Sequence, residues 1–178
     1  MTVEVQSKTS AEIQRGLDAF ELDAGLAYLD NEALRNVRAV PLYRERYVLL
    51  TAQPDLFAGR DHLSWQEAAQ VPLCLLSASM QNRRIIDGLI ARAGGPPARP
   101  RLEATSMLAL CAHVRLGPWA SIVPSSITLV LGGGLRAIPL EGPAEPYTVG
   151  VVASDRDPPA PLTRAFLAEA GAANLTPP

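Results

Sequence analysis

Pairs of hydroxyl-bearing residues stand where helices are expected to begin in this sequence. The first turn of a helix presents free backbone amides and the positive end of the helix dipole, and nearby hydroxyls add hydrogen bonds, so a small anion binds well there. Ordinary N-capping accounts for any single pair, whereas convergence of several pairs predicts a binding site for a small polar or anionic molecule. The pairs are Thr9 with Ser10, Ser77 with Ser79, Thr105 with Ser106, and Ser125 with Ser126.

Arginine side chains could complete such a site, because a guanidinium group binds a carboxylate through two parallel hydrogen bonds. Arg83 and Arg84 lie about one turn into a helix expected to start at Ser79. Arg101 is the third candidate. One of the two neighbouring arginines could reach the binding site while the other faces water. A fully solvated helix surface is the alternative for both.

The sequence shows no arrangement of residues that is typical of a catalytic site. His62 and His113 are far apart in the sequence, and neither has the spacing of an acid–base pair or a metal site. The Gly132-Gly133-Gly134 run lacks the lysine and the spacing of a phosphate-binding loop. No nucleophile elbow is present. We therefore expect that the protein is not an enzyme and has no metal and no cofactor.

The two cysteines, Cys74 and Cys111, sit inside apolar segments without CxxC spacing. Buried thiols in a reducing cytoplasm are therefore expected rather than a disulfide or a metal pair. An apolar environment raises the pKa of a thiol and lowers its reactivity, which argues against Cys111 as a redox sensor.

Strands and helices alternate along most of the chain. Apolar residues at every second position predict strands, and apolar residues at helical spacing predict helices. Strands are expected at 2–6, 24–29, 37–42, 47–52, 73–76, 102–104, 120–123, 135–140 and 148–153. Helices are expected to begin at Ser10, Ser64, Ser79, Ser106 and Pro124, with a last helix around 162–167. Such alternation predicts an α/β fold with largely parallel sheets.

Two short stretches nearly repeat each other, each followed by a tyrosine and a β-branched run: 37–42, Val-Arg-Ala-Val-Pro-Leu, and 135–140, Leu-Arg-Ala-Ile-Pro-Leu. In both copies a proline, which cannot donate to a strand ladder, is expected to end one strand before the next begins. The copies predict two hinge strands that cross between two lobes around a cleft. Lobe I would contain residues 1–46 and 139–178, and lobe II residues 47–138. Chance repetition of a common strand ending is the alternative.

The composition is that of a globular protein, with 48% apolar residues and a formal net charge of −2 over 178 residues. Because the chain has no clustered basic face, we do not expect it to bind nucleic acid itself. Its apolar runs are too short to span a membrane, and its first residues show no export signal. We therefore expect a cytoplasmic protein without a membrane partner.

Several motifs, in this order, resemble the ligand-binding domain of LysR-type transcriptional regulators. They are Gly16 to Leu26, Pro41-Leu42-Tyr43, Val48-Leu49-Leu50-Thr51, Ser106 to Gly117 with Ile122-Val123-Pro124, and finally Pro139-Leu140 with Asp155-Arg156. The resemblance implies the type II periplasmic-binding-protein fold, with two α/β lobes joined by two hinge strands around an effector cleft. The intact regulator would be a homodimer or tetramer.

The same resemblance selects residues for effector binding, and the effector is expected to be a small polar or anionic metabolite. The hydroxyl pairs that match positions near the family's cleft are Thr9, Ser10, Ser77, Ser79, Thr105 and Ser106, whereas Ser125 and Ser126 are weaker candidates. Tyr28 also matches a cleft position, and Met107 would offer flexible apolar surface. Packing at a lobe edge or in the core is the alternative for these two residues.

The chain departs from the family pattern at its start. Thr2–Gln6 resembles the second strand of the sensing domain, so the DNA-binding helix-turn-helix and the opening strand–helix unit are expected to be absent. DNA would then be bound only through a helix-turn-helix that is not in this chain. Unpaired strand amides are expected to make the isolated chain marginally stable or aggregation-prone. The alternative functions are a free-standing solute-binding protein of the same fold and an enzyme on a similar scaffold.

Overall fold

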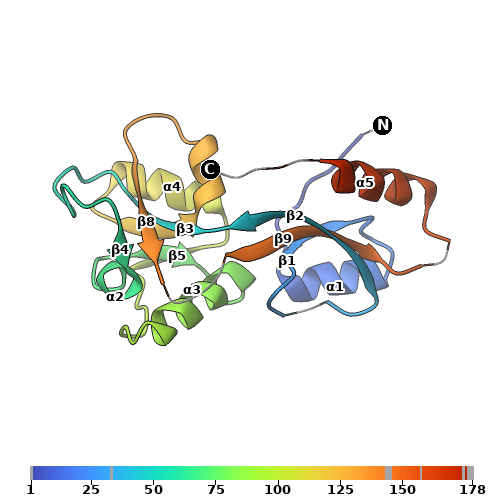
Figure 1. Cartoon of the computed structure of the whole chain (residues 1–178), viewed down its shortest axis with the longest axis horizontal. Coiled ribbons are helices and arrows are strands. Elements are labelled where there is room, and N and C mark those ends of the chain that lie inside the picture. Colours follow the sequence, from blue (N-terminus) through green and yellow to red (C-terminus); the bar gives the residue numbers. More distant parts are fainter. Residues whose placement is uncertain (1, 33, 143–145, 157, 174, 176–178) are drawn as a thin grey trace. The chain divides into compact units, whose positions relative to one another are not determined.

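The chain forms two compact units in the computed structural model (Figure 1). Unit 1 contains Met1–Glu45 and Tyr147–Pro177, and unit 2 contains Arg46–Pro146. The structure describes residues 2–32, 34–142, 146–156, 158–173 and 175. The sequence places the return to the first lobe at residues 138–139, whereas the described residues 139–142 and Pro146 group with unit 2. The second copy of the proline repeat therefore precedes the return and does not form it.

Unit 1 is built on a three-stranded antiparallel sheet in the order β1-β9-β2. The central strand β9 pairs with both neighbours, and its Gly150 lies where a Cβ atom would come within 2.6 Å of the Val40 carbonyl oxygen. A glycine at this position therefore permits the close approach of β2. The strands are β1 (Gly25–Tyr28), β2 (Val37–Glu45) and β9 (Tyr147–Ser154).

Two helices cover opposite faces of this sheet (Figure 1). In α1 (Ser10–Asp18), Ile13 lies against Gly25, whose strand neighbour is Val152. In α5 (Pro161–Ala172), Gly171 lies near Val40, which pairs with Val151. Because successive strand residues point to opposite faces, the contacts near Val152 and Val151 belong to different sides of the sheet.

The predicted strand at Thr2–Gln6 is not formed. Residues 2–9 belong to no helix or strand, and Val3 and Val5 are 71% and 89% exposed. Alternating apolar residues form a strand where a neighbouring strand supplies hydrogen bonds and a packed face. In the described part of unit 1, β1 pairs with β9 and not with this segment.

Unit 2 contains a four-stranded sheet in the order β4-β8-β3-β7 and a two-stranded sheet of β5 and β6. A parallel bridge between Leu73 and Ala120 links the segment before β5 to β7. The strands are β3 (Tyr47–Thr51), β4 (Leu63–Ser64), β5 (Cys74–Leu76), β6 (Leu102–Ala104), β7 (Ala120–Pro124) and β8 (Arg136–Glu141).

The helices of unit 2 start close to the predicted positions, and the first has the predicted cap. Ser64 and Glu67 form a capping box, in which the Ser64 hydroxyl accepts from the Glu67 amide and the Glu67 carboxylate accepts from the Ser64 amide. The helices are α2 (Trp65–Ala68), α3 (Gln81–Arg92), α4 (Met107–Leu116) and the 3-10 helix η1 (Ser125–Leu129).

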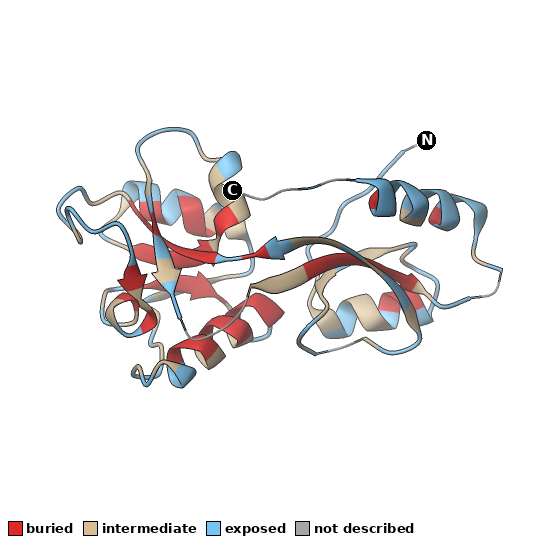
Figure 2. Ribbon diagram, viewed as in Figure 1, coloured by how far each residue is buried: buried red, intermediate tan, exposed pale blue. Residues whose placement is uncertain are grey.

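The core of unit 2 lies between its strands and the helices α3 and α4 (Figure 2). The predicted inward face of α3 is confirmed, since its four apolar residues at 85, 86, 89 and 90 are buried. A second buried cluster joins α4 to the strands, and Met80 and Met107 pack at its margin. The cluster consists of Val48, Leu50, Cys74, Leu76, Leu110, Cys111, Val114 and Val123.

Pro41 and Pro139 lie inside strands, so the prediction that they end strands is wrong. β2 continues through Pro41 to Glu45 with a register shift after the proline. It is an edge strand, where a missing amide donor is tolerated. Pro139 pairs with Val48 of β3, and the pairing of β8 with β4 begins one residue later, at Leu140. A proline therefore interrupts hydrogen bonding on one side of a strand without terminating it.

The prediction of largely parallel sheets is also wrong for the described strands. The pairs β1–β9, β2–β9, β3–β7 and β3–β8 are antiparallel, whereas β4–β8 and β5–β6 are parallel. The strands that lead out of unit 1 and into unit 2, β2 and β3, pair with returning strands, β9 and β8. In both cases the outgoing strand and the returning strand run in opposite directions and pair directly, so the pairing is antiparallel. The alternation of strands and helices along the sequence does not reveal this pairing.

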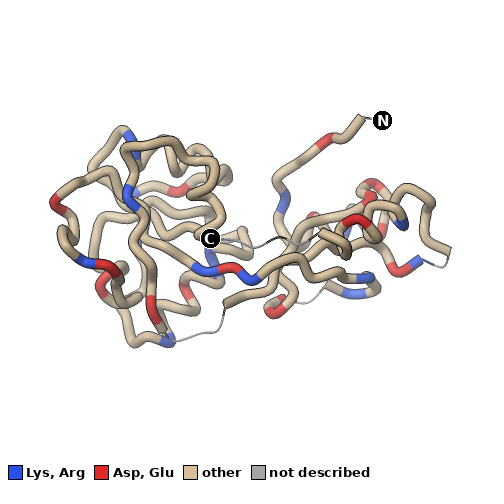
Figure 3. Tube along the Cα trace, turned by 45° about the horizontal axis from the view of Figure 1, so that its top comes forward, with Lys and Arg blue, Asp and Glu red and all other residues tan. Residues whose placement is uncertain are grey.

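Charged residues of both signs are interspersed along the two units (Figure 3). Ion pairs occur in each, with Arg38 Nε 2.6 Å from Asp155 Oδ1 in unit 1 and Arg60 Nη1 3.0 Å from Glu67 Oε1 in unit 2. These side chains are substantially exposed, so the pairs contribute little to stability.

Candidate functional site

Two helices of unit 2 begin at the same end of the β5–β6 sheet. The strands are parallel, with Leu76 opposite Ala104 in the last registered pair. The Ser77 amide donates to the Ala104 carbonyl oxygen at 2.9 Å, which extends this pairing by one step. The segments that lead into α3 and α4 therefore leave the sheet at one edge. In open α/β sheets, ligands bind outside the carboxyl ends of parallel strands.

Ser77 and Ser79 lie on the segment that leads into α3. Their hydroxyl oxygens are 3.2 Å apart. The predicted helix start at Ser79 is wrong, because α3 begins at Gln81 and its N-cap residue is Met80. The Met80 amide donates to the Ser77 carbonyl oxygen in a turn, which delays the helix. Met80, the N-cap residue, makes no side-chain hydrogen bond to the first turn of α3.

Thr105, Ser106 and Met107 lie on the segment that leads into α4. Ser106 is the N-cap residue, as predicted, and its Oγ accepts a hydrogen bond from the Ala109 amide at 3.4 Å. Thr105 and Ser106 are exposed, whereas Met107 is half-buried against the core cluster. We name this edge of unit 2 the α3/α4 site; the predicted residues that it brings together are Ser77, Ser79, Thr105, Ser106 and Met107.

Arg84 is the candidate arginine that contacts the α3/α4 site. Its Nη1 donates to the carbonyl oxygens of Ala78 at 3.1 Å and Ser79 at 2.6 Å. The guanidinium group thus places a positive charge against the segment before α3. Arg101 precedes β6 and so belongs to the opposite end of that strand. Sequence reasoning left the choice among the arginines open, and no local pattern in the sequence decides it, because it depends on the contact of Arg83 with the distant Glu103.

Arg83 has a structural role. Its side chain is 7% exposed, and its Nε donates to both carboxylate oxygens of Asp87 at 3.0 Å. Its Nη1 donates to Glu103 at 2.6 Å and to the Leu76 carbonyl oxygen at 3.0 Å. Burial disfavours the charge, but the hydrogen bonds to Glu103 and Asp87 outweigh it and raise the pKa of Arg83. These contacts fasten α3 to β5 and β6.

Thr9, Ser10 and Tyr28 belong to unit 1. The N-cap of α1 is Thr9 and not Ser10, which is the first helical residue. Thr9 caps the helix together with Glu12, which lowers the pKa of Glu12 through hydrogen bonds from the Thr9 amide and hydroxyl. The Tyr28 ring meets the Tyr147 ring edge to face, with centroids 6.1 Å apart. A role of these three residues in effector binding stays a prediction.

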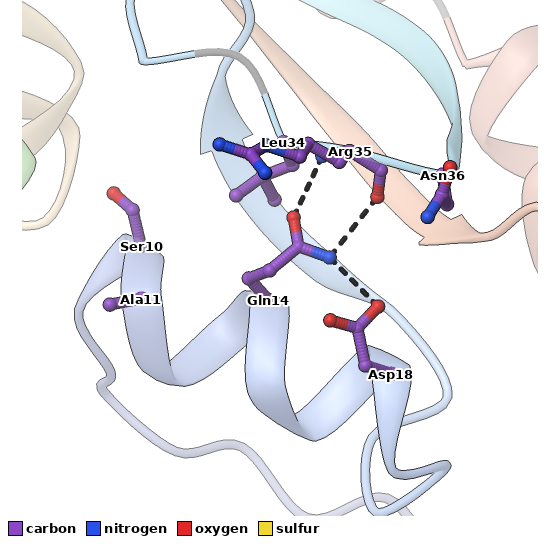
Figure 4. A pocket seen from close by; sticks show the side chains of 7 residues that line it. All are labelled: Ser10, Ala11, Gln14, Asp18, Leu34, Arg35 and Asn36. Carbon is purple, nitrogen blue, oxygen red and sulfur yellow. Dashed lines mark hydrogen bonds between the residues drawn. The ribbon is translucent and has the colours of Figure 1, made fainter.

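An open hollow of about 450 Å³ lies beside α1 in unit 1 (Figure 4). At its centre, Gln14 accepts a hydrogen bond from the Arg35 amide and donates to the Arg35 carbonyl oxygen and to Asp18. The Gln14 side-chain amide thereby connects the segment before β2 to α1, so its role is structural. The lining residues are Ser10, Ala11, Gln14, Asp18, Leu34, Arg35 and Asn36.

Each histidine contacts one nearby oxygen atom, and both cysteines are buried. The His62 Nε2 lies 3.7 Å from a Glu141 carboxylate oxygen, and the His113 Nδ1 lies 2.7 Å from the Ala109 carbonyl oxygen of its own helix. Both thiols are free and buried. Burial raises the pKa of Cys74 to about 11 and also raises that of Cys111, as predicted for an unreactive thiol.

Metal-binding clusters and membrane-spanning helices are both absent from the described parts of the two units. No group of three or more His, Cys, Asp or Glu side chains there could hold a metal ion. None of the described helices has the length and apolar character needed to cross a lipid bilayer.

The family model for the LysR substrate binding domain matches residues 1–174. The chain therefore belongs to this family of effector-binding domains of transcriptional regulators, with the type II periplasmic-binding-protein-like fold. The family is one of regulator domains and not of enzymes. A search of curated proteins found no match.

Three solved structures illustrate the similarity of fold, each with a TM-score of 0.75. The Corynebacterium glutamicum OxyR C206 mutant is 21% identical over 93% of this chain and 52% of its own. Full-length CbnR complexed with its target DNA is 20% identical over 96% of this chain and 59% of its own. The effector binding domain of QuiR in complex with shikimate is 20% identical over 92% of this chain and 77% of its own. This chain thus spans little more than half of the first two proteins.

Proposed function

We propose that this chain is the effector-sensing part of a LysR-type DNA-binding transcriptional regulator, and that it binds a small polar or anionic metabolite at the α3/α4 site. The observation that carries the proposal is the hydrogen bond from the Ser77 amide to the Ala104 carbonyl oxygen, which joins the two helix starts at one edge. The same proposal includes Thr9, Ser10 and Tyr28 of unit 1 as further effector contacts.

The chemistry of the α3/α4 site favours an anionic group. The start of α3 presents backbone amides and the positive end of the helix dipole, and both favour an anionic group. The hydroxyls of Ser77 and Ser79 add adjustable donors beside these amides. Arg84 contributes a positive charge next to Ser79. A carboxylate with neighbouring hydroxyl groups would use all three kinds of donor.

The experiment is a thermal-shift screen of small carboxylates, followed by calorimetric titration of the compounds that raise the melting temperature. Shikimate is included because the solved structure of the QuiR effector binding domain contains it, and because it is a hydroxylated carboxylate. A ligand that binds the native chain alone stabilises it in proportion to its affinity and concentration. We expect at least one carboxylate in the panel to bind.

A double variant, Ser77→Ala with Ser79→Ala, removes both hydroxyls from the segment before α3. The matched control is Ser126→Ala, which removes a hydroxyl from η1, after β7 and in the same unit. We expect weaker binding in the double variant and unchanged binding in the control. Equal affinity in all three proteins would exclude the α3/α4 site as the place of binding.

The proposal extends to the partners of the intact regulator. It would act as a homodimer or tetramer in the cytoplasm, and it would contact DNA through a helix-turn-helix that is not in this chain. A free-standing solute-binding protein of the same fold is the alternative function. Reading the genomic bases upstream of the Met1 codon separates the two, because an in-frame helix-turn-helix supports the regulator and a secretion leader supports the alternative.

A further inference from the structure

Three side chains from separate elements of unit 2 form a continuous series of contacts. Tyr47 opens β3, Trp65 opens α2, and Asn82 lies in the first turn of α3. The Asn82 Nδ2 donates to the Tyr47 hydroxyl at 3.2 Å. The Tyr47 and Trp65 rings meet edge to face with centroids 5.8 Å apart, and the Trp65 Nε1 donates to the Gly142 carbonyl oxygen at 2.8 Å.

All three side chains are buried. Tyr47 is 4% exposed, Trp65 3% and Asn82 9%. Interiors are packed as densely as organic crystals, so a displaced side chain must be accommodated by its direct neighbours. An edge-to-face ring pair also has a preferred geometry, which a rotation of either ring would disturb. The series is therefore suited to pass a displacement from one element to the next.

The series of contacts begins next to the α3/α4 site and ends near the points where the chain enters and leaves unit 2. Asn82 is the second residue of α3, three positions after Ser79 of the α3/α4 site. Tyr47 is the second residue of unit 2, immediately after the chain enters it from unit 1. Gly142 lies shortly before Pro146, where the chain leaves unit 2. One series of contacts thus joins the α3/α4 site to both connections of the unit.

We propose that Tyr47 is a positioning residue, which passes the placement of the first turn of α3 to Trp65 and to both chain connections of unit 2. This inference rests on the proposed function, because it takes the start of α3 as part of the effector site. An effector that draws this turn toward itself moves Asn82, and the Tyr47 hydroxyl transfers the movement to the two rings. Occupancy of the site is thereby coupled to the connections between the units.

The indole of Trp65 provides a direct readout. The chain has two tryptophans, so the indole region of a ¹⁵N NMR spectrum contains two signals, and Trp119 serves as the internal reference. The hydrogen-exchange rate of the Trp65 indole reports its hydrogen bond to Gly142. We expect Tyr47→Phe and Asn82→Ala each to accelerate this exchange about fivefold relative to Trp119, the effect of one lost hydrogen bond. The double variant should exchange no faster than either single variant.

Two further variants separate positioning from general loss of stability. Asn82→Asp offers a carboxylate that accepts a hydrogen bond from the Tyr47 hydroxyl, so we expect it to restore slow exchange of the Trp65 indole, but not when combined with Tyr47→Phe. Ile86→Val weakens a buried contact on the same helix and should leave the ratio of Trp65 to Trp119 exchange unchanged. Two results would overturn the role of Tyr47. In the first, the Tyr47→Phe, Asn82→Ala double variant accelerates exchange of the Trp65 indole by the product of the two single effects. In the second, Ile86→Val accelerates this exchange relative to Trp119 as much as Tyr47→Phe does.

This measurement requires no ligand, so its outcome is separate from that of the effector screen. Independent effects of the two substitutions refute the inference even if a carboxylate binds at the α3/α4 site. Non-additive effects support it even if no compound in the panel binds, in which case the proposed function alone fails.

Discussion

Replacing Ser106 by aspartate or by asparagine separates helix capping from recognition of effector charge. Both replacements keep an oxygen that can accept the hydrogen bond from the Ala109 amide, and Asn, Asp and Ser cap helices about equally well. Aspartate alone adds a negative charge at the exposed start of α4. The two variants therefore differ in charge at the α3/α4 site and very little in capping.

The expected size of the effect follows from the distance and the exposure. Two negative charges about 4 Å apart repel by about 1 kcal/mol in bulk water and by about 4 kcal/mol at an effective dielectric constant of about 20. Ser106 is exposed, which places the repulsion near the lower limit, at about 1–2 kcal/mol. For an anionic effector at this site, this repulsion weakens binding roughly 5- to 30-fold in Ser106→Asp relative to Ser106→Asn.

The assay is calorimetric titration of both variants with the carboxylate found by the screen, at low salt and at about 1 M salt. The difference in affinity should shrink at high salt, where the Debye length is about 3 Å. Urea unfolding provides the control, and we expect the two variants to agree within about 0.5 kcal/mol in the free energy of unfolding. Equal affinities at low salt would refute the reasoning, because they would mean that no negative charge of the effector lies near Ser106.

Three other predictions concern charged and buried groups of unit 2. Arg83→Met should lower the free energy of unfolding by about 2 kcal/mol in urea titrations, since it removes bonds to two carboxylates and one carbonyl; unchanged stability would contradict the structural role. At pH 8 a thiol reagent should label neither Cys74 nor Cys111 in the folded chain. Because the pKa of Cys74 is raised to about 11, stability should fall as the pH rises from the ordinary thiol pKa toward 11; rapid labelling at pH 8 would contradict the burial. Hydrogen bonds from the Ser64 amide and hydroxyl, with Arg60, lower the pKa of Glu67 to about 2, so its stabilising effect should be full above pH 4.5 and lost as the pH falls toward 2. Glu67→Gln should remove that part of the acid dependence, and identical unfolding profiles of both proteins from pH 2 to 6 would speak against it.

Helix starts were predictable from the sequence where a side chain caps the helix. Ser64 and Ser106 accept hydrogen bonds from amides of the first turn, and both starts agree with the prediction. Ser79 failed as a start because the turn from Ser77 to Met80 uses the backbone, and the helix then begins at Gln81 with Met80 as its N-cap residue. A serine before an apolar helical pattern therefore indicates a helix nearby, but not which residue caps it.

Sheet direction was less accessible to sequence reasoning. The short strands and their apolar faces could be read from local patterns, whereas their pairing depends on where the chain returns. The strand that includes Pro139 pairs with β3 in unit 2, and the return to unit 1 follows at Tyr147. No local feature of the proline repeat distinguishes a strand inside a unit from a strand that leaves it.

The site was predictable in part. The parallel pairing of β5 and β6 brings the segments with Ser77 and Thr105 to one edge, as the expected strand–helix order implies. The choice between Arg83 and Arg84 was not predictable, because it depends on Glu103. This residue is distant from Arg83 in the sequence and accepts a hydrogen bond from it in the folded chain. Long-range ion pairs of this kind leave no local signal.

The most direct test of the central claim is an amide NMR titration of the chain with a carboxylate that the thermal-shift screen identifies. If the effector binds at the α3/α4 site, the largest shifts in unit 2 will fall on the amides of residues 77–83 and 105–109, at the starts of α3 and α4. Shifts confined to other parts of the chain, such as the hollow around Gln14 and Asn36, with these amides unchanged, would contradict the claim.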